Sequence, residues 1–141
     1  MAKTDLPPID LNNPDSARRA LAEALLLLGE GGIPHVASVL QDFGHSQVSS
    51  HFRSGYEKDM LQVIGAKLGE WVAANVPEGV DVHPHVLHGT IYDQTLRAAD
   101  RLSVDLIVMG LHRPELSDHL LGPNAARVVR YAKQSIDVVR I

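Results

Sequence analysis

The sequence predicts an α/β protein with a parallel sheet that is covered by helices on both faces. From about residue 33 onward, segments typical of strands alternate with amphipathic helical segments, and this alternation implies right-handed crossovers between parallel strands. Leu106–Met109 is a short, uniformly apolar run closed by Gly110, which is typical of a strand buried on both faces. The 141 residues fit a single domain over residues 1–141 that can bury a sizeable core.

Composition limits the function classes. The net charge of −4 and the pI of about 6.0 argue against a broad nucleic-acid-binding or anionic-membrane surface, because such surfaces need clustered Lys and Arg. The absence of cysteine excludes disulfides, thiol catalysis and Cys-ligated zinc. Residues 1–13 lack an apolar stretch of signal-peptide length, and the longest apolar run, Ala24–Leu28, is too short to span a bilayer. We therefore expect a cytoplasmic protein with no nucleic-acid or membrane partner.

In the first half of the chain, the signals predict a helix, a strand and a loop. Asn13 can cap a helix whose first position is Pro14. One apolar face follows, formed by Ala17, Ala20, Leu21, Ala24, Leu25 and Leu28. The glycines at positions 29, 31 and 32 are expected to end the helix. Residues 33–40 predict a short strand, and residues 41–54, rich in Ser, Gly and His, show no periodicity and predict a loop.

The second half predicts alternating helices and strands. A helix is expected over residues 56–75, and its core face consists of Met60, Ile64, Leu68 and Trp71, or alternatively of Leu61 and Val63. A third strand is expected from Val80 to Leu87, interrupted by Pro84. Thr90 and Asp93 resemble a capping box at the start of a helix that reaches about residue 102. Residues 123–133 predict the last helix, and residues 136–141 the last strand.

Three segments would lie at the carboxyl ends of the strands, where open α/β sheets bind ligands: residues 10–14, 89–90 and 110–124. The third is the most informative, because glycine lets a backbone approach a ligand closely and the free amides of a helix N-terminus attract an anion. Additional hydrogen-bond donors near this segment are His112, Arg113 and His119. The alternative is that Gly110 and Gly122 are turn glycines without a ligand.

Several segments resemble the universal stress protein family. The most specific are Asp-Leu-Ile-Val-Met-Gly at residues 105–110 and Leu-Leu-Gly-Pro-Asn-Ala-Ala-Arg-Val-Val-Arg-Tyr-Ala at residues 120–132. Residues 8–10, residues 17–24 and Gly89 followed by a helix match the family in the same order. The resemblance implies a flavodoxin-like (adenine nucleotide alpha hydrolase-like) open parallel sheet of five strands in the order 3-2-1-4-5. It also implies binding of ATP or AMP, with or without magnesium, and a homodimer through the last strand.

The resemblance assigns roles to individual residues. It implies that Asp10 lies at the end of the first strand against the adenine and that Val39 lies at the end of the second strand and lines the base pocket. It places Gly110 beside the ribose and phosphates, Gly122 at the phosphate tail, and Gly89 at the start of the third helix. The complete set of implied nucleotide-binding residues is Pro8, Asp10, Val39, Gly89, Met109, Gly110, His112, Arg113, Gly122, Pro123, Asn124 and Ala125.

The glycine motif departs from the family pattern. Nucleotide-binding members carry Gly-x-x-Gly, nine residues, and then Gly followed by Ser or Thr. Here Arg113 replaces the second glycine, only eight residues separate it from Gly122, and Pro123 replaces the hydroxyl residue. Pro123 offers no N–H or hydroxyl to a phosphate, whereas Arg113 can form a charge-assisted contact. The expected function is a regulatory or signalling module in the stress response, and the alternative is a dimeric interaction protein with a decayed nucleotide site. In either case the protein partner is unknown.

Polar residues and prolines interrupt the expected strands. Asp5 and Pro7 lie in the first strand, Pro34 in the second and Asp137 in the last. A proline cannot donate to a sheet, and a buried carboxylate must reach water, be protonated or find a partner. We expect a short or irregular first strand and an altered dimer edge near Asp137.

Histidines and a serine suggest other chemistry. His83 and His85 would share one face of a strand, and His88 follows, but Pro84 would break the strand and no carboxylate cluster completes a metal shell. The segment 117–119, Ser-Asp-His, has the composition of a triad without a spacing that implies one. We therefore expect no metal site, no catalytic residues and at most weak ATP hydrolysis.

Overall fold

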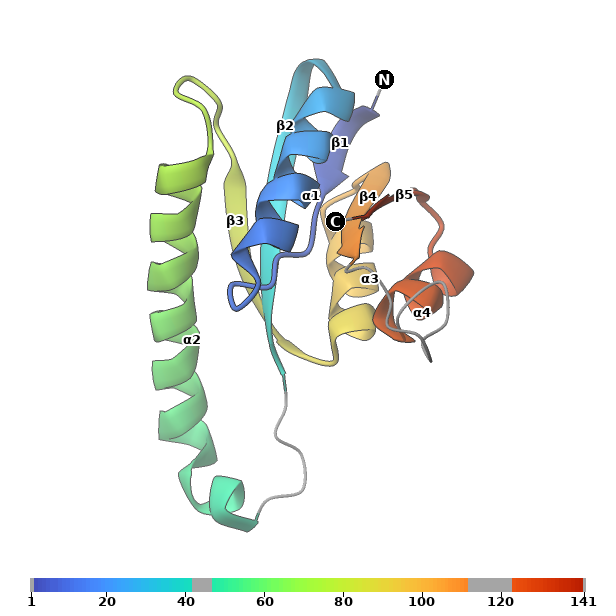
Figure 1. Ribbon diagram of the computed structural model, residues 1–141. Coiled ribbons are helices and arrows are strands. Elements are labelled where there is room, and N and C mark those ends of the chain that lie inside the picture. Colours follow the sequence, from blue (N-terminus) through green and yellow to red (C-terminus); the bar gives the residue numbers. More distant parts are fainter. Residues whose placement is uncertain (1, 42–46, 112–122, 141) are drawn as a thin grey trace.

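The five strands form a parallel sheet in the order β3-β2-β1-β4-β5 (Figure 1). The computed structural model describes residues 2–41, 47–111 and 123–140, with the backbone alone for residues 2, 47–54 and 123. The strands are β1 (Ala2–Leu6), β2 (Leu28–Gln41), β3 (His83–Gly89), β4 (Leu106–Leu111) and β5 (Ser135–Arg140). The helices are α1 (Pro14–Leu27), α2 (Gln47–Asn75), α3 (Ile91–Arg101) and α4 (Pro123–Tyr131). The predicted fold class and strand order are confirmed.

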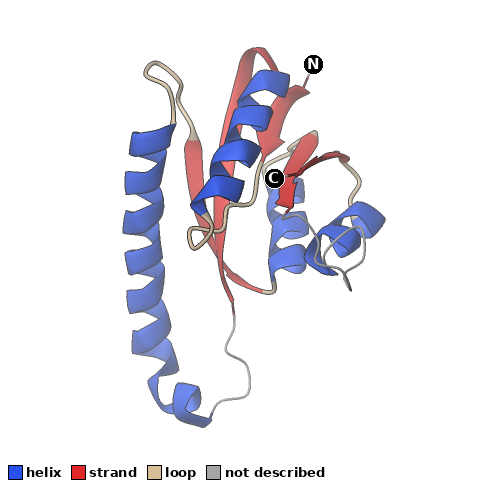
Figure 2. Ribbon diagram, in the orientation of Figure 1, coloured by secondary structure: helices blue, strands red, loops and turns tan. Residues whose placement is uncertain are grey.

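Helices cover both faces of the sheet (Figure 2). On one face, side chains of α1 and α2 pack on the sheet: Ala17, Leu21 and Leu68 form a cluster with Ile9, Val36 and Val82. On the other face, Ala98, Ala99, Ala125 and Val128 of α3 and α4 pack on Leu6, Ala37, Leu87, Ile107 and Met109. Trp71 packs against the first cluster beside the buried Leu68, which confirms these two residues of the first core face expected for α2. Val72, which belongs to neither expected face, packs there as well. Within the described ranges, no helix combines the length and the apolar character needed to cross a membrane.

Strand β1 is short and irregular, as the sequence predicts. It ends at Leu6, because neither Pro7 nor Pro8 has an N–H to continue the ladder. Its register with β2 shifts: Ala2 lies opposite Leu28, but Thr4 lies opposite Ile33. β1 thus advances two residues while β2 advances five, and the glycines of residues 29–32 supply the extra length of β2. An isolated bridge between Pro8 and Ala37 then keeps the chain beside β2.

Asp105, which directly precedes β4, is hydrogen-bonded to residues of β1. Its carboxylate accepts the backbone N–H groups of Lys3 and Thr4, both at 3.0 Å, and its own N–H donates to the Thr4 carbonyl at 3.2 Å. The Lys3 N–H, followed by the Thr4 N–H, holds the pKa of Asp105 below its ordinary value. This exposed carboxylate therefore stays ionised beside β1.

Asp5 is fully buried in the middle of the sheet, between Pro34 of β2 and Leu106 of β4. Neither of its carboxylate oxygens has a hydrogen-bond partner among the described residues. Burial raises the pKa of Asp5 from 3.8 to about 7, and the nearby Asp105 carboxylate adds to the increase. Of the three outcomes expected for such a residue, this environment favours protonation.

Three expected boundaries are wrong, and one is the start of β3, which lies at His83 and not at Val80. Strand β2 begins at Leu28 rather than Ile33, because the chain passes directly from α1 into an extended conformation at Leu28 (φ −74°, ψ 135°). The glycines therefore follow the helix end as part of a strand and do not form a helix cap. Helix α2 begins at Gln47, so residues 47–54 are helical and not a loop, while residues 42–46 of the expected loop lie outside the described residues. A helix can propagate through residues that show no apolar period, since each added residue gains a backbone hydrogen bond.

Three local expectations also need correction. Asn13 and Thr90 occupy the expected cap positions of α1 and α3, but neither side chain makes a capping hydrogen bond. Asp93 does not complete a capping box, because its carboxylate binds Arg97 one turn later at 3.0 Å. Pro84 does not interrupt β3: it lies inside the strand, opposite Val36, and a proline is tolerated there because β3 is an edge strand.

Candidate functional site

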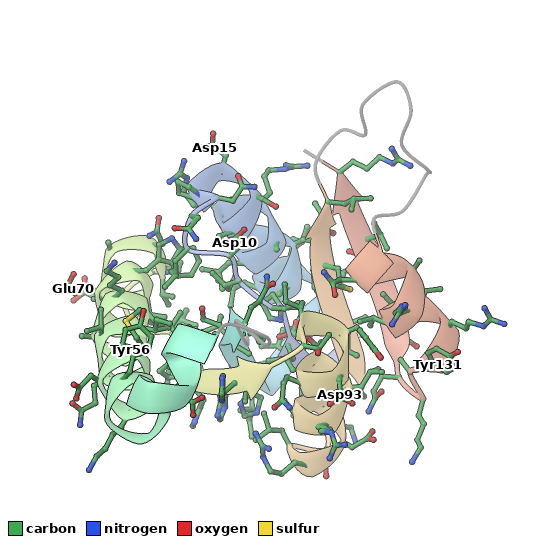
Figure 3. All side chains as sticks on the ribbon, turned by 90° about the horizontal axis from the view of Figure 1, so that it is seen from below. Asp10, Asp15, Tyr56, Glu70, Asp93 and Tyr131 are labelled. Atoms are coloured by element: carbon green, nitrogen blue, oxygen red, sulfur yellow. The ribbon has the colours of Figure 1, made fainter. Side chains whose placement is uncertain are left out.

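The strand order reverses between the neighbouring strands β1 and β4, and the candidate site lies at the carboxyl ends of the strands around this point. From β1 the chain crosses to β2 and β3 on one side, and from β3 it returns to β4 and β5 on the other. Open α/β sheets bind ligands at such a crossing point. In Figure 3, seen from below, Asp10 lies near the middle of the molecule, Asp15 lies at the start of α1 and Asp93 lies on α3.

Asp10 lies in the loop between β1 and α1. It follows the end of β1 by four residues, so the expectation that it ends the strand is wrong; the prolines at positions 7 and 8 end the strand earlier. Its Oδ1 atom accepts the N–H of Asn12 at 2.9 Å, and its carbonyl accepts the N–H of Asn13 at 3.0 Å. The side chain is exposed, and this turn directs it toward the solvent at the carboxyl edge of the sheet.

Gly110 lies in β4 against the first turn of α1. A Cβ atom at this position would be 2.8 Å from Ser16 Oγ, 2.9 Å from the Ser16 carbonyl oxygen and 3.4 Å from Ala20 Cβ. The glycine therefore allows α1 to approach β4 closely, which brings the start of α1 to the crossing point. The sequence prediction assigns Gly110 to a ligand and does not identify Ser16. The two small residues one turn apart on α1, Ser16 and Ala20, are the sequence signal that could have indicated close packing of this helix against a glycine.

Three of the predicted site residues share one apolar cluster. Met109 and Ala125 are buried in the core on the α3 and α4 face, and Val39 packs against the same cluster. They come from β4, α4 and β2, and the structure thus brings together positions far apart in sequence. Pro8 contributes through its bridge to Ala37 of β2, a member of the same cluster. These residues form an apolar floor beneath the carboxyl edge.

Gly89 ends β3 with a φ of +139°, a backbone conformation that side chains rarely adopt. A Cβ atom there would also lie 3.0 Å from the Gln94 Nε2 atom. The next residue, Thr90, precedes α3, whose first intrahelical hydrogen bond runs from the Gln94 N–H to the Thr90 carbonyl at 3.0 Å. The first amides of α3 consequently have no side-chain cap from Thr90 and point toward the carboxyl edge.

Helices α3 and α4 are joined by a contact that the sequence prediction misses. The Arg127 guanidinium lies 4.8 Å from the centre of the Tyr92 ring, a cation–π geometry. Tyr92 is in the first turn of α3 and Arg127 in the second turn of α4, so a positive charge stands beside the start of α3. No motif in the sequence indicates this pair, because it depends on how the two helices lie side by side.

The central part of the glycine motif lies outside the described residues. This applies to the predicted site residues His112, Arg113 and Gly122 and to the Ser-Asp-His segment at 117–119. The structure does describe the start of α4 at Pro123, as predicted, and Asn124 is half-buried near that start.

The histidines divide between the two faces of β3. His83 and His85 share the face covered by α3, where they meet His35 of β2. His88 lies on the opposite face, and its Nε2 atom is 4.0 Å from the Glu57 carboxylate of α2. Among residues 2–41, 47–111 and 123–140, no group of three or more His, Asp or Glu side chains is placed to hold a metal ion.

Comparisons with known proteins agree with this architecture. The family model described as Universal stress protein family matches residues 1–140. Universal stress protein G of Escherichia coli O157:H7 is 28% identical over 144 residues, which cover 99% of this chain and 100% of that protein.

Two solved structures share the fold. The hypothetical protein MJ0577 superposes with a TM-score of 0.77 at 17% identity, covering 99% of this chain and 96% of that one. A universal stress protein in complex with cAMP superposes with a TM-score of 0.67 at 22% identity, covering 98% of this chain and 96% of that one. Since the family model spans nearly the whole sequence, the chain belongs to the universal stress protein family.

Proposed function

We propose that this protein binds an adenine nucleotide, ATP or AMP, at the carboxyl edge of its sheet and acts as a cytoplasmic regulatory module in the stress response. The observation that carries the proposal is the convergence of three elements at the β1–β4 crossing point: the Asp10 loop, the first turn of α1 held against Gly110, and the apolar floor of Val39, Met109 and Ala125. The cAMP bound by a structural neighbour supports the same class of ligand.

The adenine ring fits the apolar side of this site. Val39, which is only partly buried, offers apolar surface on which a planar base can lie, and Met109 belongs to the buried cluster behind it. The Asp10 carboxylate is oriented by the Asn12 N–H and remains exposed, so it can accept a hydrogen bond from the exocyclic amino group of adenine. This arrangement favours adenine over a base that carries a carbonyl at the same position.

The phosphates would extend toward the starts of α3 and α4. The free amides that follow Gly89 and Thr90 attract an anion, and the Arg127 side chain adds positive charge nearby. In this proposal Gly122 permits close approach of the backbone, and Arg113 replaces donors that Pro123 cannot supply. When magnesium accompanies ATP, it neutralises part of the phosphate charge. The nucleotide acts by occupancy, since the bound and free forms present different surfaces to a protein partner.

Calorimetric titration with ATP and AMP, each with and without magnesium, tests this function. We expect saturable binding at or below millimolar concentration, and a thermal transition that moves upward with ligand concentration. Gly122→Leu should weaken binding by about tenfold or more, because in this proposal residue 122 lies beside the phosphates and leaves no room for a side chain. Glu70→Gln changes an exposed side chain on the outer surface of α2 and serves as the control (Figure 3).

The alternative function makes the opposite prediction. A decayed site would give no heat and no thermal stabilisation at millimolar nucleotide, with either ligand and with or without magnesium. Binding that Gly122→Leu leaves unchanged would contradict the proposed position of the phosphates even if the nucleotide binds. The two failures are therefore distinguishable, one concerning the function and the other the placement of the ligand.

We also propose that two chains associate through β5. This strand lies at the end of the sheet order, and Tyr131 and Val129 of the neighbouring α4 are 62% and 44% exposed. Sedimentation velocity over a concentration series should show a dimer that dissociates on dilution, and a monomer at every concentration would contradict this association.

A further inference from the structure

Three histidines that the proposed nucleotide site does not use gather at the other end of the sheet. His35 of β2 is 8% exposed, and its ring centre lies 5.1 Å from that of His85 and 5.4 Å from that of His83. The His35 Nδ1 and His85 Nε2 atoms are 2.9 Å apart, which is hydrogen-bond distance. The contact joins the edge strand β3 to β2 through side chains, in addition to the backbone ladder.

The contact depends on protonation. A hydrogen bond between two imidazole nitrogens needs one N–H donor and one free lone pair, so at least one of the two nitrogens must be unprotonated. When only one of the two facing nitrogens carries a proton, the hydrogen bond can form. When both carry a proton, two N–H donors face each other and neither has an acceptor. The second protonation therefore removes the bond and replaces it with repulsion between two cations.

The surrounding charges oppose protonation. Arg101, at the end of α3, and His83 are the neighbouring positive or titratable groups, and both disfavour a charge on His85. The Asp81 carboxylate lies 3.5 Å from His83 Nε2, and it is 93% exposed. The other acidic groups near this end have different partners: Asp100 accepts a hydrogen bond from Gln134 at 2.9 Å, and Asp105 binds Lys3 and Thr4.

We propose that His35, His83 and His85 form a proton-sensitive latch that holds the amino-terminal half of β3 against β2 when neutral and releases it when the His35–His85 pair is doubly protonated. Burial, followed by the neighbouring histidines and Arg101, lowers the pKa of His35 and His85 below 6.5. The latch is thus intact above pH 6.5 and weakens as the pH falls below that value, because the unfolded or opened chain binds protons more readily. Since β3 leads into Gly89 and α3, release of its amino-terminal half loosens the strand that ends at the proposed nucleotide site.

Hydrogen exchange measured by NMR tests the latch. Between pH about 7.5 and about 5, we expect the protection factors of β3 amides to fall by about tenfold relative to those of β4, because the opened strand binds protons more readily than the closed one. Protection factors correct for the intrinsic pH dependence of exchange, and EDTA in the buffer removes divalent cations that could bridge the imidazoles. The His85→Gln protein should lose this pH dependence, whereas the His88→Gln protein, changed on the opposite face of the same strand, should keep it.

Direct titration of the histidine rings provides a test that needs no variant. The ring signals of His35 and His85 should titrate below pH 6.5 and be coupled to each other. Titration of both rings at or above their ordinary pKa would overturn the proposal. Equal loss of protection in β3 and β4, or unchanged pH dependence in folded His85→Gln protein, would overturn it as well.

Discussion

The Asp5→Asn protein is expected to be more stable than the parent protein above pH 7, by up to about 4 kcal/mol, and to lose most of this advantage near pH 4. The pKa of Asp5 is about 7 in the folded protein, against 3.8 ordinarily. Between these values the folded protein holds a proton that the unfolded chain has released, so stability falls as the pH rises from 3.8 to 7. Above pH 7 the full cost of a buried carboxylate is present, and asparagine removes it.

Urea unfolding of both proteins at several pH values between about 4 and 8 measures this effect. The asparagine amide is also buried without an evident partner, which adds a constant difference, so the pH-dependent part of the difference is the decisive quantity. The Asp59→Asn protein, changed at an exposed position of α2, should show no comparable dependence. A difference between Asp5→Asn and the parent that does not vary with pH would contradict the proposed environment of Asp5.

The pH dependence of the histidine latch does not affect the difference in stability between the Asp5→Asn protein and the parent. Asp5 lies opposite Pro34 in the register, and His35 follows Pro34, so Asp5 and His35 project from opposite faces of the sheet. The latch destabilises the protein as the pH falls, whereas Asp5 destabilises it as the pH rises. Because the latch is present in both proteins, its contribution cancels in the difference between Asp5→Asn and the parent.

The sequence predicts β4 well and β2 poorly, for a physical reason. Leu106–Met109 is apolar at every position because helices cover both faces of β4, so the pattern directly reflects the burial. The start of β2 carries glycines that usually mark the end of an element. Their place in a strand follows from the bulge between the Leu28 and Ile33 pairings, which depends on β1. A register shift of this kind is a property of two strands and leaves no local signal.

The candidate site shows the same division. The glycine positions and the start of α4 at Pro123 could be predicted from local signals and the family resemblance. The neighbours of these residues could not, because they come from other elements. Sequence alone places His83 and His85 on one face but does not reveal His35, since the partner across a parallel pair depends on the register. For the same reason, the sequence does not distinguish a glycine that leaves room for a ligand from one, such as Gly110, that leaves room for a neighbouring helix.

Gly110→Ala is expected to destabilise the protein by about 1–3 kcal/mol, the usual cost of an added methyl group in a closely packed core. The new Cβ would lie 2.8 Å from Ser16 Oγ and 2.9 Å from the Ser16 carbonyl oxygen, and a backbone atom cannot move without moving the first turn of α1. In the proposed function, that displacement also separates the Asp10 loop from β4 and weakens nucleotide binding.

Chemical unfolding of the single variants Gly110→Ala and Ser16→Ala and of their combination separates the two contacts. Ser16→Ala removes the hydroxyl but leaves the carbonyl, so it should recover only part of the loss caused by Gly110→Ala. Gly69→Ala is the matched control: a Cβ there meets nothing within 4 Å, and α2 should gain about 0.5–1 kcal/mol from the better helix former. If Gly110→Ala were as harmless as Gly69→Ala, α1 would not be held against β4 at this point, and the glycine would be free to admit a ligand instead.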